Sequence, residues 1–134
     1  GDLKGKRITV LGLAYKPNVD DLRESPAVKA AQSLAKIGAD VIAYEPFKED
    51  AYIEGVNVTP NLDSALKGSD ALALLVAHDP LLKLDPRQVA AMTPARLVVD
   101  AVNGWDPHPW QQAGFTVLRL GVGKPPSLSS EPPE

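Results

Sequence analysis

Runs of strand-forming residues alternate along this chain with helix-forming segments, and this alternation limits the possible folds more than any other feature. The run at residues 71–77 is apolar throughout, which is typical of a central parallel strand with both faces buried. The other runs lie at residues 7–11, 41–44, 56–58, 97–100 and 116–120. We therefore expect an α/β fold: a Rossmann-like, doubly wound parallel sheet of about six strands in three layers, α/β/α.

Capping residues and prolines predict where the helices begin. Ser25 is a good N-cap, and Pro26 suits the first helical position, where no N–H is needed. The apolar residues that follow recur at spacings of three and four, and Gly38 is expected to end this helix. Further helices are expected at residues 62–66 after Asn61, at 86–92 after Asp85, and at 110–113, with a short one within 47–55.

If the strands take the order 3-2-1-4-5-6 of one type of doubly wound sheet, that order predicts where a ligand would bind. In such a sheet a crevice opens between the first and fourth strands, beyond their carboxyl ends, and ligands bind there. Residues 12–26 follow the first strand and residues 77–79 follow the fourth. We expect these two segments to line one crevice.

The loop of residues 12–26 is too long and too charged for a plain connection. Lys16 could meet a phosphate as a mobile point charge, and Arg23 could grip one through two hydrogen bonds. The N–H groups of Ala27 and Val28 lie at the positive end of a helix, which also favours an anion.

Acidic residues outnumber basic ones in this loop, and they also complement the helix dipole. The acids are Asp20, Asp21 and Glu24. A salt-bridged loop with an ordinary N-cap is therefore the alternative interpretation, and the residues alone leave both open.

Other residues near the expected crevice have both a functional and a structural interpretation. Gly12 lacks the second and third glycines of the dinucleotide fingerprint, which disfavours ordinary NAD binding at this turn. Glu45 could contact a ribose, but a solvated strand end is favoured. His78 could form a hydrogen bond in a pocket, but a cap on the next turn is favoured. Tyr15 could stack on a base or ribose, or it could cover the core. His108 is expected to be exposed, and two separated histidines make no metal site.

Composition excludes several classes of function. The formal net charge of −3 gives no general attraction to nucleic acid or to an anionic membrane. The chain has no cysteine, so it contains no disulfide, thiolate metal ligand or thiol nucleophile. It has no signal-like start and no apolar run near 18 residues. We expect a cytoplasmic protein with one domain at residues 1–120 and a disordered tail at 121–134.

The same segments carry a family resemblance. GLAYKP at residues 12–17 and DDLRESP at 20–26 strongly resemble the C-terminal domain of the UDP-glucose/GDP-mannose dehydrogenase family. The resemblance continues through YEP at 44–46, LKGSDA at 66–71 and VVD at 98–100. It implies an NAD-dependent oxidation of the C6 hydroxymethyl group of a nucleotide sugar to a carboxylate, in two hydride transfers.

The resemblance also implies residue roles. In that family an N-terminal Rossmann domain holds NAD, a central helical region carries the nucleophilic cysteine and the dimer contact, and the C-terminal domain closes over the nucleotide. Tyr15 and Lys16 match the residues that contact the UDP-sugar, and Arg23 matches the arginine that reaches NAD. Val102 stands where many relatives place a substrate arginine, and together with LVAH at 75–78 it favours the branch acting on UDP-N-acetylhexosamines.

Oxidation through a thioester needs a thiolate, which this chain cannot supply. We therefore expect a domain of a larger enzyme, a homodimer or higher oligomer, with no catalytic residue, no metal ligand and no turnover of its own. The alternative is a free-standing Rossmann-like interaction or regulatory module that has kept the fold and lost the ligand.

Overall fold

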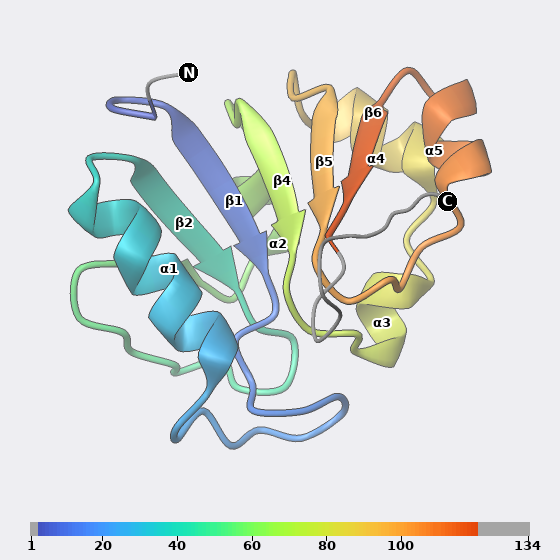
Figure 1. Cartoon of the computed structure of the whole chain (residues 1–134). Coiled ribbons are helices and arrows are strands. Elements are labelled where there is room, and N and C mark those ends of the chain that lie inside the picture. Colours follow the sequence, from blue (N-terminus) through green and yellow to red (C-terminus); the bar gives the residue numbers. More distant parts are fainter. Residues whose placement is uncertain (1–2, 121–134) are drawn as a thin grey trace.

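The computed structural model describes residues 3–120, which form a six-stranded parallel sheet with helices on both faces (Figure 1). The strand order is β3-β2-β1-β4-β5-β6, the 3-2-1-4-5-6 type considered above. The strands are β1 (Arg7–Leu11), β2 (Asp40–Tyr44), β3 (Asn57–Thr59), β4 (Ala71–Leu74), β5 (Leu97–Asp100) and β6 (Thr116–Arg119). The helices are α1 (Pro26–Lys36), α2 (Leu62–Leu66), α3 (Asp79–Leu82), α4 (Pro86–Met92) and α5 (Pro107–Gln112).

The two faces of the sheet carry separate cores. Helix α1 packs on one face, over residues such as Val10 and Val41, and lies in front of the sheet in Figure 1. Helices α2, α4 and α5 pack on the other face, where Leu72, Leu74 and Val98 are buried. The doubly wound arrangement is therefore confirmed.

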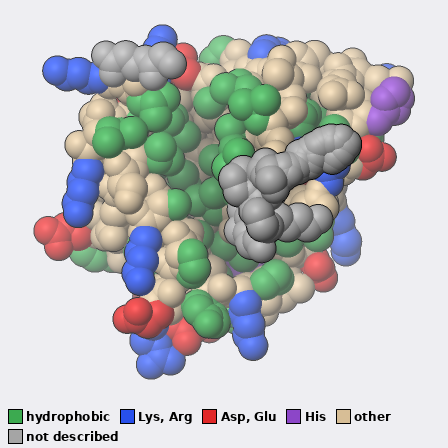
Figure 2. All heavy atoms as spheres, in the orientation of Figure 1, with side chains coloured by type: hydrophobic (Ala, Val, Ile, Leu, Met, Phe, Trp, Pro, Cys, Tyr) green, Lys and Arg blue, Asp and Glu red, His purple; other side chains and the backbone are tan. Residues whose placement is uncertain are grey.

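Helix α1 covers only part of its face. The strand register points Ala73 and Val99 toward the same side as Val10. Within residues 3–120 no helix packs over β4, β5 and β6 on that side, and Leu118 is 49% exposed there. Figure 2 shows hydrophobic side chains gathered on this face beside α1.

Side-chain caps start the helices as the sequence indicated. The Ser25 hydroxyl accepts hydrogen bonds from the Ala27 and Val28 N–H groups at 3.1 and 3.4 Å. Asn61 caps α2 and Asp85 caps α4 in the same way. Gly38 follows α1 with a φ of 102°, the left-handed conformation expected of a helix stop.

The structure differs from these predictions in two expected boundaries, one unexpected helix and one expected helix that does not form. Strand β4 ends at Leu74 although the sequence is apolar to residue 77, and α3 follows where no helix was expected. Helix α5 begins at residue 107 rather than 110, because Asp106 accepts a hydrogen bond from the His108 N–H group. Residues 47–55 form separate turns, whose i to i−3 hydrogen bonds do not continue into a helix.

The predicted tail at residues 121–134 lies outside the described residues. Between residues 3 and 120, no helix is long and apolar enough to cross a membrane.

Gly12 allows the ends of β1 and β4 to approach closely, which gives a test of the fold. Its φ is 97°, and a Cβ added there would lie 2.6 Å from the Cβ of Val76. Gly55 has a φ of 82° with open space around it, so it provides a matched control. We expect Gly12→Ala to lower the free energy of unfolding by about 1–3 kcal/mol more than Gly55→Ala does, measured by denaturant titration. Equal losses would show that β1 and β4 do not crowd this position.

Candidate functional site

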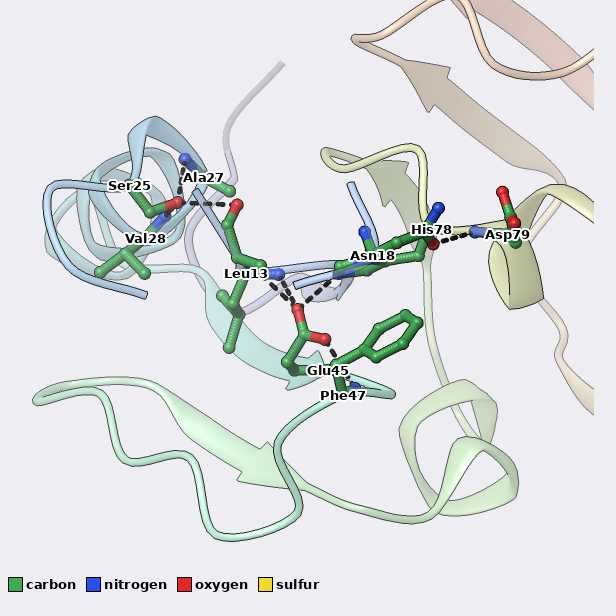
Figure 3. Close-up of polar contacts among 10 residues, drawn as sticks. Leu13, Asn18, Ser25, Ala27, Val28, Glu45, Phe47, His78 and Asp79 are labelled. Carbon is green, nitrogen blue, oxygen red and sulfur yellow. Dashed lines mark hydrogen bonds and ion pairs between the residues drawn. The ribbon is translucent and has the colours of Figure 1, made fainter. Parts of the chain in front are cut away.

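The loops that follow β1 and β4 meet at the carboxyl edge of the sheet, as predicted. The Asn18 N–H group donates a hydrogen bond to His78 Nδ1 at 2.8 Å, and the Asp79 N–H group donates to Asn18 Oδ1 at 2.9 Å (Figure 3). Asn18 has a φ of 63°, which asparagine tolerates better than most residues. Residues 12–26 and 77–79 therefore lie next to each other beyond the carboxyl ends of β1 and β4.

Glu45 lies at the centre of this edge. It is 1% exposed, so the expectation of a solvated strand end was wrong. Its Oε1 accepts hydrogen bonds from the Leu13 and Ala14 N–H groups at 2.9 and 3.0 Å and lies 2.8 Å from His78 Nε2. Its Oε2 accepts from the Phe47 N–H group at 2.8 Å. These donors compensate the carboxylate for the water that it loses on burial.

His78 joins Glu45 to the loop. Because the Asn18 N–H group is a donor, Nδ1 of His78 must be an acceptor, and the ring is neutral with its proton on Nε2. That proton is donated to Glu45. The expected side-chain cap on the following turn was wrong, since His78 makes no such bond at the start of α3. Both ring nitrogens are instead held by protein partners, Asn18 and Glu45.

Two opposing effects set the pKa of Glu45. Burial acts to raise the pKa of this carboxyl, because a charge is poorly solvated inside the protein. The hydrogen bonds from His78, Leu13 and Phe47 act in the other direction and together outweigh burial, so the pKa lies below its ordinary value of 4.5.

Tyr15 and Lys16 combine a fixed backbone with free side chains. Tyr15 is 57% exposed, and Lys16 is exposed beside it. The Tyr15 N–H group donates to the Asp21 carbonyl at 2.7 Å, and the neighbouring Ala14 and Asn18 N–H groups are held by Glu45 and His78. The loop thus presents an aromatic ring and a positive charge from an ordered backbone.

Arg23 follows the salt-bridged interpretation of the loop. Its Nε and Nη2 donate to the two carboxylate oxygens of Asp21 at 3.0 and 2.9 Å. The hydrogen bond from the Arg23 side chain lowers the pKa of Asp21 to about 2. Together with Tyr15 and Glu24, this pair lines an open depression of about 540 Å³. Figure 2 shows basic and acidic side chains next to one another along the lower edge of the view, where this loop lies.

The start of α1 does not offer free N–H groups to an anion. The Ala27 and Val28 N–H groups both donate to the Ser25 hydroxyl, so their expected role in anion binding was wrong. Ser25 in turn donates to the Ala14 carbonyl at 3.2 Å (Figure 3). The cap therefore stabilises the junction of loop and helix.

The loop after β5 is organised by Asp100, which the sequence analysis did not single out as a site residue. Asp100 is fully buried and accepts hydrogen bonds from the N–H groups of Val102, Gly104 and Trp105. Val102 is half-buried and packs against the core, so it presents no polar group to a ligand. His108 is exposed as predicted, and within residues 3–120 no cluster of His, Asp and Glu could hold a metal ion.

Comparison with known proteins assigns the family of this site. Residues 9–107 match the UDP binding domain of the UDP-glucose/GDP-mannose dehydrogenase family. The chain belongs to this family. It is 33% identical over 121 residues to the UDP-N-acetyl-D-mannosamine dehydrogenase of Methanocaldococcus jannaschii, covering 88% of this chain and 27% of that protein. It is 34% identical over 124 residues to the UDP-glucose 6-dehydrogenase of Rhizobium meliloti, covering 90% and 28%.

Solved structures of related dehydrogenases share the fold. An NDP-N-acetyl-D-galactosaminuronic acid dehydrogenase from Methanosarcina mazei superposes with a TM-score of 0.80 at 23% identity, over 90% of this chain and 25% of that one. A UDP-D-ManNAc dehydrogenase from Pyrococcus horikoshii gives 0.75 at 26% identity, over 91% and 27%. This member of the UDP-glucose/GDP-mannose dehydrogenase family thus spans about a quarter of the length of these relatives.

The depressed pKa of Glu45 predicts how stability depends on pH. The unfolded chain binds the Glu45 proton more tightly than the folded one, so this carboxylate stabilises the fold above pH 4.5 and loses its effect as pH falls through the folded-state pKa. We expect Glu45→Gln to lower the free energy of unfolding by about 2 kcal/mol at neutral pH and to make it less dependent on pH below about 4.5.

Denaturant titrations between about pH 3 and pH 7 provide the measurement. Glu49→Gln, the same change at an exposed position, controls for the general effect of removing a negative charge. An acid dependence that is identical in wild type and Glu45→Gln would contradict the ionised state of Glu45.

Proposed function

We propose that this chain is the nucleotide-sugar-binding part of an NAD-dependent dehydrogenase, which oxidises the C6 hydroxymethyl group of a UDP-sugar to a carboxylate. Membership of a family with a UDP binding domain supports this proposal. The observation that carries it is the exposed Tyr15–Lys16 pair on an ordered backbone at the switch point of the sheet. Ligands of open α/β sheets bind at such a point.

Each residue of the proposed site has a distinct role. Lys16 places a mobile ammonium group where it neutralises the diphosphate of the nucleotide. Tyr15 presents a largely exposed ring that stacks on the base or ribose. Both roles require the side chains to be free of intramolecular partners, which suits their exposure.

Arg23 takes the proposed role of contacting NAD across the cleft. Its bidentate pair with Asp21 is exposed, with 89% of the arginine side chain accessible. Ion pairs at such positions contribute little to stability, so a phosphate group presented by another domain can compete for the guanidinium. In this proposal, Asp21 holds Arg23 in place until the cofactor-bearing domain closes.

The remaining parts of the reaction come from outside this chain. A chain without cysteine has no thiolate for a thioester intermediate, so an N-terminal NAD-binding domain and a central cysteine-bearing region are the proposed partners. On the face of the sheet that carries α1, the exposed Leu118 of β6 supports such neighbours, because exposed apolar side chains suit contact with another domain. The proposed parent enzyme is a homodimer or a higher oligomer in the cytoplasm.

The proposed substrate is a UDP-N-acetylhexosamine. The name of the Methanocaldococcus jannaschii relative contains this class of sugar nucleotide. Val102, which is half-buried and apolar, leaves the position of the family's substrate arginine without a charge.

Titration with UDP and UDP-N-acetylhexosamines, followed by ¹H–¹⁵N NMR, tests the binding role. We expect a dissociation constant between roughly millimolar and high micromolar, because the proposed NAD-binding domain would supply the other half of the cleft, with shifts at residues 12–26. Lys16→Ala should weaken binding by at least about fivefold, since it removes a charge-assisted contact. Lys67→Ala, the same change just before β4 and so at the opposite edge of the sheet, is the matched control. Shifts confined to other residues, or equal effects of the two variants, would favour an interaction module without this ligand.

The absence of a thiol predicts no turnover by the isolated chain. Incubated with NAD and UDP-sugars, the 134-residue chain should produce no NADH absorbance above the protein-free rate. Steady turnover by this chain would mean that a residue within it carries the oxidation, contrary to the proposed division of roles.

A further inference from the structure

The backbone on either side of Tyr15 and Lys16 is anchored to two buried side chains. On one side, the Leu13 and Ala14 N–H groups donate to Glu45. On the other side, the Asn18 N–H group donates to His78. Glu45 and His78 are bonded to each other, so both ends of the exposed segment are attached to one buried unit.

We infer that the buried Glu45–His78 pair, together with Asn18, positions Tyr15 and Lys16 for the nucleotide before the ligand arrives. This inference rests on the proposed function and assigns to it three positioning residues that touch no ligand. Glu45 and His78 have fully buried side chains, so water and salt do not compete for the anchoring bonds.

Histidine suits its position for a chemical reason. A neutral imidazole has a donor on one ring nitrogen and an acceptor on the other, at opposite sides of a rigid ring. His78 uses the donor toward Glu45 and the acceptor toward Asn18, and so bridges the end of β2 to the loop after β1. The ring also contacts Phe47, with centroids 4.8 Å apart, which fixes its plane.

Asn18 completes the anchor in two ways. Its left-handed backbone turns the chain so that its N–H group points at His78 (Figure 3). Its side-chain oxygen accepts from the Asp79 N–H group at the start of α3. The loop is therefore attached to the β4 side through both its backbone and its side chain.

Such anchoring bears on affinity because ordering a loop costs free energy. Fixing the backbone of each residue costs conformational entropy, so a ligand that has to order a loop when it binds does so more weakly. A loop that is already ordered avoids this loss. The anchors should thus change the dissociation constant for UDP even though they lie beneath the proposed site.

Two conservative substitutions of His78 separate the anchors. In His78→Asn, the amide oxygen takes the place of Nδ1 and still accepts from Asn18, but the bond to Glu45 is lost. In His78→Gln, the amide nitrogen reaches Glu45, but the Asn18 N–H group loses its acceptor. Thr9→Val is the control for stability, because Thr9 is buried in β1 and bonds to the Ala65 carbonyl and Ser69, away from the loop.

The test measures UDP dissociation constants and ¹H–¹⁵N spectra of the 134-residue chain and its variants at neutral pH. We expect His78→Gln to weaken UDP binding about five- to tenfold and to displace the Tyr15 and Lys16 resonances in the free protein. His78→Asn should weaken binding less. Thr9→Val should keep the wild-type dissociation constant for UDP, even if its denaturation midpoint falls as far as that of His78→Gln.

The outcomes distinguish this inference from the proposed function. If the wild-type chain does not bind UDP, the proposed function fails and the positioning role fails with it. If wild type binds UDP and His78→Gln binds equally well, the positioning role alone is overturned. An equal loss of affinity in Thr9→Val would also overturn it, because the effect would then follow stability rather than the anchor.

Discussion

The buried carboxylate of Glu45 is the group on which the carboxyl edge of the sheet depends. It accepts hydrogen bonds from three backbone N–H groups and from His78, so it links the end of β2 to the loop after β1 and to the segment after β4. A charge at 1% exposure is tolerated only because these donors replace water. Removing the carboxylate would leave the Leu13, Ala14 and Phe47 N–H groups and His78 without this shared acceptor.

Above this buried unit, the backbone of the loop is ordered while its side chains are exposed. The backbone of residues 14–18 is held by hydrogen bonds, while Tyr15 and Lys16 extend into solvent. Arg23 is exposed too, but it is paired with Asp21. Side chains of this kind have weak individual interactions in water and strong ones when a second surface excludes water. The geometry therefore suits a domain that supplies one wall of a closing cleft.

Most helix boundaries could be predicted because they depend on local signals. Ser25, Asn61 and Asp85 are capping residues whose hydroxyl, amide or carboxylate groups bond to N–H groups two or three residues away. Gly12 ended the first strand in the sequence as it does in the structure, where its missing Cβ leaves room for Val76. The family resemblance rested on the same loop and was confirmed by the match to residues 9–107.

What the sequence could not indicate depends on contacts between distant residues. Glu45 reads as a surface residue because its partners, Leu13 and His78, are 32 and 33 positions away. The run to Ala77 reads as strand, but its pairing with β1 stops near Leu11, and the chain then turns into α3. Asp100 is similar, because only the folded loop brings the Val102 and Trp105 N–H groups to it.

We infer that the buried Glu45–His78 pair fixes the loop in the absence of ligand. The most direct measurement is amide hydrogen exchange of the free, wild-type chain at the Ala14 and Asn18 N–H groups. If Glu45 and His78 hold these groups, both should exchange slowly, at rates like those of the strand amides of β1 and β4. Exchange of either group at the rate of an unstructured peptide would contradict the account.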